Sequence, residues 1–191
     1  MVLEIQNIKE IMSVLVYTES ENQKFKKVAL EAASYAKAVA DQLGTTVTAI
    51  TINANDTSEL GNYGIDKVLQ VSNSQLENFN ANTYADIIKQ AAEKENAKVV
   101  IVSSSINSKY LAPLLAVGLN AGYASNVVDA PANTSPFTVK RTAFSNKSFE
   151  MCQINTDVQL IGVSKHSFGL FESTANASAY EFSPSIPDFG I

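Results

Sequence analysis

The chain has 191 residues, of which 46% are hydrophobic and 17% charged, and it carries a net charge of −5 with a pI near 4.9. This composition suits a globular protein with one well-buried domain, and an acidic chain with a single arginine, Arg141, is unsuited to nucleic-acid backbones, which bind clustered cations. No stretch approaches the roughly 20 apolar residues of a membrane helix, and the N-terminus lacks the pattern of a signal peptide, so we expect a cytoplasmic protein without membrane insertion.

Five apolar runs predict the strands of a parallel sheet. Three of them are continuous, as is typical of strands buried on both faces, and two are shorter. Residues 1–11 precede the first run and a second methionine, Met12, and are expected to form an N-terminal extension. The runs are 13–18, 46–52, 68–71, 98–103 and 126–129.

Helical patterns separate these runs. The expected helices are 25–43, a short one at 57–63, one that opens at Thr83, and 110–121. Gly44 and Gly122 are expected to end the first and last of them. Thr83 and Asp86 have the spacing of a capping box, and Pro113 is expected in the first turn of its helix. This alternation predicts an α/β fold with helices on both faces of a mostly parallel sheet.

The pattern changes after Asp129. Residues 137–144, 147–155 and 158–163 are strand-like, and a tight turn at Ser145 and Asn146 joins the first two. We expect all three to add antiparallel strands at the edge of the sheet. From residue 164 Ser, Asn and Pro are frequent, which predicts a domain over 12–170 and a linker or tail over 171–191, whose aromatic residues suggest packing against a surface.

A ligand site in an open parallel sheet lies at the carboxyl ends of the strands where strand order reverses, here at loops 19–24 and 104–109. The first loop, within TESENQKFKK, contains no glycine, which argues against a dinucleotide fingerprint, a P-loop or an ATP pyrophosphatase loop. The second, SSSINSKY, offers hydroxyls and helix amides near Lys109 for a weakly held anion. Ordinary helix capping is the favoured interpretation.

Nucleophilic catalysis has little support in the sequence. Ser103, Ser104 and Ser105 are available, but the only histidine, His166, falls in the Ser- and Asn-rich region that begins at residue 164. Loss of an activity on changing His166 would be the first sign of a small-molecule hydrolase. We assign no catalytic, cofactor-binding or metal-binding residue.

Two single residues stand out by type. Cys152 lies in an alternating apolar and polar segment and is expected to be a structural thiol in or near the core, because one cysteine forms no internal disulfide and no Cys/His group has metal-ligand spacing. Arg141, beside Lys140, either pairs with a carboxylate or phosphate across an interface or is an exposed charge on an edge strand. The second alternative is favoured.

Several segments together resemble one family. VLVYTE, YGIDKVLQV, YADIIKQAAEKENAKVVIVSSS, LAPLLAVGLNAGYASNVVD and FTVKRTAFSNKSFEM are similar, in this order and spacing, to the N-terminal domain of the electron transfer flavoprotein alpha subunit. The resemblance covers roughly residues 12–169. It implies an adenine nucleotide alpha hydrolase-like (HUP-type, Rossmann-like) three-layer fold with a twisted sheet.

The resemblance also implies a function. Members of the family form an alpha/beta heterodimer that carries electrons from flavin-linked dehydrogenases through FAD, so this chain would be a subunit of an electron carrier and not an enzyme. FAD is held mainly by a Gly-rich C-terminal domain that these residues do not contain, so we expect FAD in the full-length protein and not on this part. A stand-alone nucleotide-binding protein of the universal stress type is the alternative, and ATP binding would support it.

Overall fold

The computed structural model describes residues 13–187, so the expected extension 1–11 lies outside the described residues. The elements follow the predicted βα alternation. The parallel strands of the main sheet are β1 (Ser13–Tyr17), β4 (Val47–Ile52), β5 (Lys67–Val71), β6 (Ala97–Ser103), β7 (Gly122–Val127), β11 (Gln159–Val163) and β12 (Ser178–Glu181). The helices are α1 (Lys27–Leu43), α2 (Ala81–Lys94) and α3 (Ile106–Leu119), with short 3-10 helices at Ser58–Asn62 and Ser74–Leu76.

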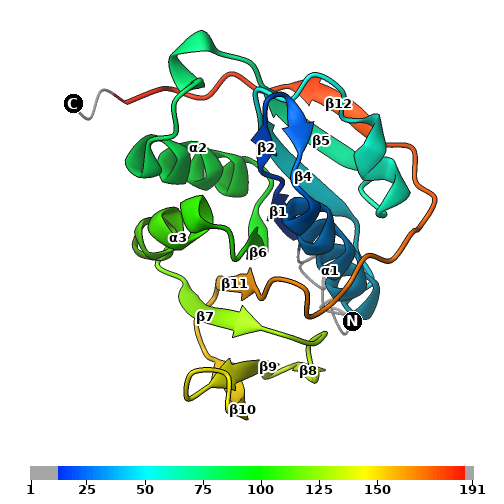
Figure 1. The fold of residues 1–191 in the computed structure, drawn as a ribbon, viewed down its shortest axis with the longest axis vertical. Helices are drawn as coiled ribbons and strands as arrows, with labels where there is room; N and C mark the ends of the chain where they lie inside the picture. Colours follow the sequence, from blue (N-terminus) through cyan, green and yellow to red (C-terminus); the bar gives the residue numbers. More distant parts are fainter. Residues whose placement is uncertain (1–12, 188–191) are drawn as a thin grey trace, which may run out of the picture.

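The sheet lies between two helical layers (Figure 1). Its strand order is β10-β9-β7-β11-β6-β1-β4-β5-β12. Strand β1 shows why both faces are covered: Val14 and Val16 pack with α1, whereas Leu15 and Tyr17 pack with α2 and α3. A strand buried on both faces gives the continuous apolar run from which it was predicted. The predicted three-layer α/β fold with a mostly parallel sheet is confirmed.

The antiparallel edge is confirmed for two of the three strands expected there. Strands β9 (Phe137–Ala143) and β10 (Ser148–Ile154) form a hairpin, and β9 pairs antiparallel with β7. The turn between them carries positive φ at Ser145 and Asn146, as expected, and at Phe144 as well. The two-residue strand β8 (Asn133–Thr134) extends this edge.

The third expected edge strand was placed wrongly. Strand β11 is parallel, and it lies between β6 and β7 in the middle of the sheet. All five of its residues are buried. Its run of apolar residues is therefore that of a central parallel strand. In sequence β11 follows β7, β9 and β10, all of which lie nearer to the edge of the sheet.

The region expected to be a linker or tail also contributes a strand. Residues 178–181 form β12, which pairs parallel with β5 at the opposite edge of the sheet. Before it, residues 164–177 form a segment, here called the strap, that leaves β11, crosses beside α1 and returns to the far edge (Figure 1). A Cβ on Gly61 would come within 2.4 Å of the Ala175 carbonyl oxygen, so the strap requires glycine there.

Three helix boundaries differ from the prediction. Helix α2 begins at Ala81, because Asn80 and not Thr83 caps it and accepts hydrogen bonds from the backbone N–H of Asn82 and Thr83. Helix α3 begins four residues early, at Ile106, which places Pro113 in its interior and not in its first turn. It ends at Asn120, which takes the left-handed conformation expected of Gly122. Gly44 ends α1 as predicted, with φ 69°.

Candidate functional site

The predicted switch point lies at the carboxyl ends of β1 and β6. From β1 the chain builds β4 and β5 on one side, and from β6 the sheet continues to the other side. The loops predicted to flank this point, 19–24 and 104–109, do so. The first is not a plain loop, because β2 (Ser20–Glu21) and β3 (Lys24–Phe25) pair as a small hairpin whose turn residues, Asn22 and Gln23, have positive φ.

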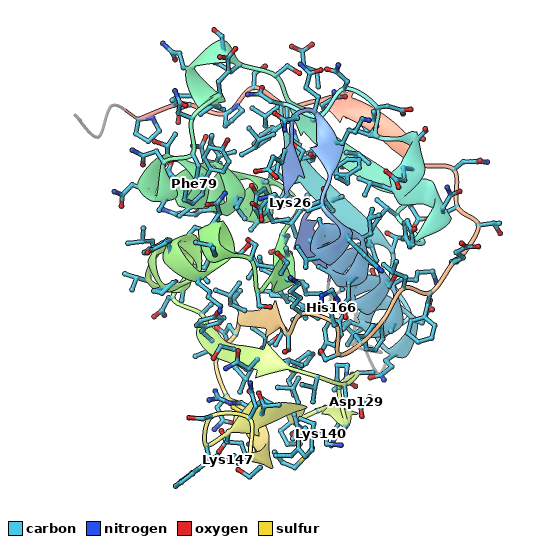
Figure 2. The ribbon with its side chains drawn as sticks, in the orientation of Figure 1. Lys26, Phe79, Asp129, Lys140, Lys147 and His166 are labelled. Carbon is cyan, nitrogen blue, oxygen red and sulfur yellow. The ribbon has the colours of Figure 1, made fainter. Side chains whose placement is uncertain are left out.

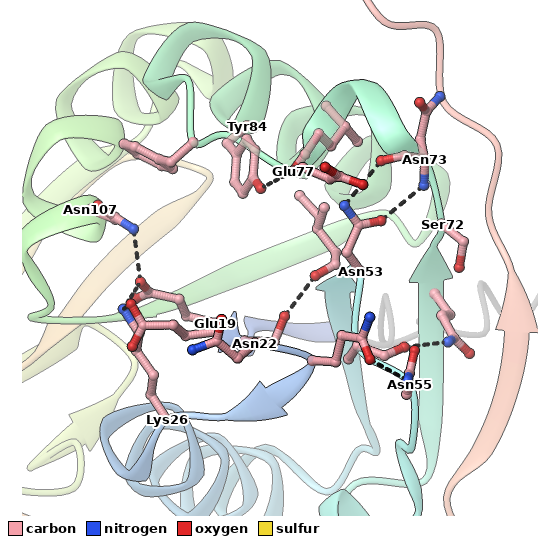
Figure 3. Close-up of a pocket in the computed structure, with 18 of the residues that line it drawn as sticks. Glu19, Asn22, Lys26, Asn53, Asn55, Ser72, Asn73, Glu77, Tyr84 and Asn107 are labelled. Carbon is pink, nitrogen blue, oxygen red and sulfur yellow. Dashed lines mark hydrogen bonds and ion pairs between the residues drawn. The ribbon is translucent and has the colours of Figure 1, made fainter.

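Glu19 lies at the centre of the switch point. It follows β1 directly, and its side chain is 2% exposed. Its Oε1 accepts a hydrogen bond from Lys26 Nζ at 2.7 Å and another from Asn107 Nδ2 at 3.0 Å (Figure 3). The carboxylate therefore ties the end of β1 to the start of α1 and to the first turn of α3.

The charge of Glu19 affects the groups around it. Partial burial of Lys26 opposes its charge, but the hydrogen bond and the negative charge of Glu19 leave the pKa of Lys26 raised. Burial, followed by the charge of Glu19, raises the pKa of Tyr17 well above its usual value. The same two causes, in the same order, raise the pKa of Tyr84. Both phenols are therefore neutral at physiological pH.

A cavity of about 800 Å³ opens beside Glu19, at the carboxyl ends of β1, β4 and β5 (Figure 3). Two asparagines shape its far wall: Asn53 Nδ2 donates to the Asn73 carbonyl at 3.0 Å, and the Asn73 N–H donates to Asn53 Oδ1 at 2.9 Å. Asn53 and Asn73 follow β4 and β5 and were not predicted as site residues. The signal that could have found them is the polar residues directly after each strand, in INAND and VSNSQ.

The serines after β6 serve the start of α3. Ser105 Oγ accepts a hydrogen bond from the Ser108 N–H at 3.0 Å, which is a helix cap, and Ser103 Oγ and Ser108 Oγ lie 3.3 Å apart. Ser104 Oγ accepts from the backbone N–H of Lys165 at 2.8 Å and so anchors the strap. Helix capping, the favoured interpretation, describes the contact of Ser105, whereas Ser104 holds the strap.

The remaining residues singled out in the sequence are not among those that line the cavity. His166 is on the strap, where its backbone N–H donates to Glu31 Oε2 at 2.9 Å and its side chain is exposed. Arg141 Nε lies 3.0 Å from Oε1 of Glu150, the residue paired with it on β10, in a close ionic contact without aligned hydrogen-bond geometry. Cys152 is half-buried against the core, as expected.

The part of the chain that the structure describes contains neither a cluster of metal ligands nor a helix that could cross a membrane. Within residues 13–187, no three His, Cys, Asp or Glu side chains gather in a way that could hold a metal ion. Among the same residues, no helix combines the length and the apolar character needed to cross a membrane.

Lys140 and Lys147 lie on the β9–β10 hairpin, far from Lys26, so the labelled lysines form no common basic patch (Figure 2).

Helix α3 carries a stripe of exposed apolar side chains. Ile106, Tyr110, Leu114 and Val117 recur every three or four residues, so they share one face of the helix, and they are 75%, 67%, 41% and 83% exposed. The opposite face, with Leu111 and Leu115, is fully buried. We call these four residues the α3 stripe. A row of large apolar side chains on a rigid helix is typical of a protein interface.

Comparison with known proteins identifies relatives. Residues 14–184 match the electron transfer flavoprotein domain family. The chain is 27% identical over 142 residues to protein FixB of Clostridium saccharobutylicum, a match that covers 72% of this chain and 42% of that protein. It is 29% identical over 147 residues to electron transfer flavoprotein subunit alpha of Bacillus subtilis, which covers 75% of this chain and 44% of the relative.

The chain thus spans less than half the length of these two relatives. Among solved structures, a universal stress protein in complex with cAMP matches with a TM-score of 0.35 and 13% identity, over 57% of this chain and 87% of that one. A likeness at this level carries no functional argument.

Proposed function

Because the chain belongs to the electron transfer flavoprotein domain family, we propose that it is the N-terminal domain of an alpha-type subunit and scaffolds the alpha/beta heterodimer. In this role the domain binds a beta-type subunit and supports the flavin domain without touching the reacting ring. The complete protein then carries electrons from flavin-linked dehydrogenases through FAD. The domain itself is a part of a carrier and not an enzyme.

The observation that carries this proposal is the α3 stripe. Large apolar side chains exposed on a helix are unfavourable in water, and their burial contributes about 25 cal/mol for each Å² removed from it. Helix α3 packs against α2 and the sheet on its other face, so the stripe is held in one geometry. The Bacillus subtilis relative is named as a subunit, which supports a partner subunit as the occupant of the stripe.

A second apolar patch is a weaker candidate for the same role. Phe144, Phe149 and Met151 on the β9–β10 hairpin are also exposed. However, Lys140 Nζ lies 4.7 Å from the centre of the Phe149 ring, where it forms a cation–π contact. This hairpin is at the sheet edge, whereas α3 has a packed helix behind it.

The described residues do not fit the pyrophosphate of a flavin or a nucleotide. A phosphate site needs backbone amides or free cations at a helix start. In the cavity at the switch point, Glu19, Glu21 and Glu77 outnumber Lys26, which is itself paired with Glu19 and Glu21 at 2.7 and 3.7 Å. This supports placing FAD outside these residues. It also disfavours the alternative, a nucleotide-binding protein of the universal stress type.

The test is co-expression of the 191-residue chain with an electron transfer flavoprotein beta-type subunit from the same organism. We expect a 1:1 complex by size-exclusion chromatography with light scattering, and a purified chain without flavin absorption near 450 nm when it is made alone. A second beta-type subunit from an unrelated assembly in that organism serves as the specificity control. A monodisperse monomer that forms no complex with the beta-type subunit contradicts the proposal.

A further inference from the structure

The cavity beside Glu19 has no role in the scaffold function, and its polar groups are arranged as in a binding site. It measures about 800 Å³, which is within the range of small-molecule pockets. It lies at the switch point of a parallel sheet, where ligands of such folds bind. These two features locate a site, and the chemistry of its lining indicates what it binds.

One atom of the lining lacks a partner. Both hydrogen bonds to the Glu19 carboxylate, from Lys26 and Asn107, go to Oε1. Within residues 13–187, Oε2 is shielded from solvent and accepts no hydrogen bond. A buried polar atom without a partner is destabilising, and such atoms in native proteins call for an explanation. A hydrogen-bond donor on a bound ligand is one such explanation, because Glu19 lines the cavity (Figure 3).

The charges of the lining exclude anions. Glu19, Glu21 and Glu77 contribute three carboxylates, and Lys26 is the only cation among the lining residues. Lys26 is paired, so the cavity has a surplus of negative charge. A phosphate ester placed there would be repelled, whereas a neutral or positively charged molecule would not.

Aromatic side chains form one wall. Phe79 and Tyr84 meet edge to face with their ring centres 5.0 Å apart, and Tyr84 meets Tyr17 in the same way at 6.4 Å. Tyr84 is held in place by its hydroxyl, which donates to the Leu76 carbonyl at 2.8 Å. A fixed aromatic wall in a cavity that Asn53 and Asn73 also line suits a ligand with one apolar ring face and several polar groups.

We propose that this cavity binds a neutral or cationic small molecule that places an amino or hydroxyl donor on Glu19 and a ring against Phe79 and Tyr84, and that it rejects phosphate esters. This binding goes beyond the scaffold role and is independent of it, because the α3 stripe is not part of the cavity lining. Either proposal can therefore fail without the other.

The test is isothermal titration calorimetry of the 191-residue chain with three probes. Adenosine is neutral and carries a ring with amino and hydroxyl donors, tyramine is a cationic ring compound, and AMP adds a phosphate to adenosine. We expect adenosine or tyramine to bind with a dissociation constant below about 1 mM, and AMP to bind at least about tenfold more weakly than adenosine. The better of the first two probes shows whether the ligand is neutral or cationic.

Two variants locate the binding. Glu19→Gln removes the acceptor charge, and Ser72→Phe fills the mouth of the cavity at an exposed residue, so it keeps the proposal testable if Glu19→Gln fails to fold. Ser148→Phe, an equivalent change at an exposed residue of β10, is the control. We expect Ser72→Phe to weaken binding at least about fivefold and Ser148→Phe to leave it unchanged. Absence of binding by both adenosine and tyramine, equal binding of AMP, or unchanged affinity in Ser72→Phe overturns the proposal.

Discussion

Replacing Glu31 by glutamine is expected to lower the free energy of unfolding by about 3 kcal/mol, because hydrogen bonds to a buried charge contribute about 1.5–3 kcal/mol each. The Glu31 side chain, on α1, is 4% exposed. Its oxygens accept three backbone hydrogen bonds from the strap, at 2.9 Å each, from His166, Phe168 and Gly169. A glutamine amide keeps one acceptor oxygen and turns an N–H toward the third donor.

The same change is expected to loosen the strap. Phe168 packs edge to face on Tyr35, and the N–H of Phe171 donates to Ser34 Oγ at 3.1 Å, so Glu31 is the central anchor of the part of the strap that crosses α1. Urea unfolding measures the stability, and limited proteolysis between residues 164 and 177 measures the loosening. Glu172→Gln, an exposed carboxylate on the same strap, is the control and should change stability by less than about 0.5 kcal/mol. An equally small change for Glu31→Gln would show that the anchor carries no stability.

Changing Val117 on the α3 stripe to glutamate is expected to weaken binding of the beta-type subunit at least about 100-fold, because an unpaired charge buried in an apolar interface costs several kcal/mol. Tyr110→Ala should weaken it about 30-fold, since tyrosine is among the residues that dominate interface energetics. Val117 is 83% exposed and Tyr110 67% exposed, so neither change should disturb folding of the isolated chain.

Surface plasmon resonance with immobilised beta-type subunit measures both affinities, and thermal unfolding of each variant checks its fold. Phe144→Glu is the matched control, because Phe144 is 85% exposed on the β9–β10 hairpin. We expect its affinity to stay within about twofold of the original, as is usual for residues outside an interface. If Phe144→Glu abolishes binding and Val117→Glu does not, the interface is on the hairpin and the α3 stripe has another role.

The sequence predicts best the elements whose burial leaves a clear pattern. Strands β1, β4 and β6 are buried on both faces and appear as continuous apolar runs, and α2 buries Tyr84, Ile87, Ile88 and Ala91, which recur at helical spacing. The order of these elements leads to the correct layers and to the switch point. Such local patterns are set by a two- or 3.6-residue period and need no knowledge of distant contacts.

Long-range pairing is where the sequence says least. All four residues of β12 are exposed, so the strand has no apolar signal and exists only because β5 offers an unpaired edge. Strand β11 has a strong signal, but nothing local shows that it inserts between β6 and β7. Helix starts were misjudged for a smaller reason: Asn80 and Ser105 compete with later residues of similar capping ability, and backbone geometry decides between them.

The sequence predicts the position of the candidate site in the fold but not all of the residues that line it. The rule for parallel sheets locates it at loops 19–24 and 104–109, and Glu19 and Asn107 meet there. The contribution of Asn53 and Asn73 depends on a pair of hydrogen bonds between two loops 20 residues apart, which no spacing pattern marks. The α3 stripe was missed because apolar residues occur all around this helix, so the sequence does not show that Leu111 and Leu115 face the core whereas Tyr110 and Val117 do not.

The most direct test of the scaffold role is hydrogen exchange of the chain with and without the beta-type subunit, followed by mass spectrometry. The proposal predicts slower exchange of backbone amides in α3, residues 106–119, when the partner is present, and unchanged exchange in the hairpin turn at 144–147. Unchanged exchange throughout α3 in the presence of saturating beta-type subunit would contradict it.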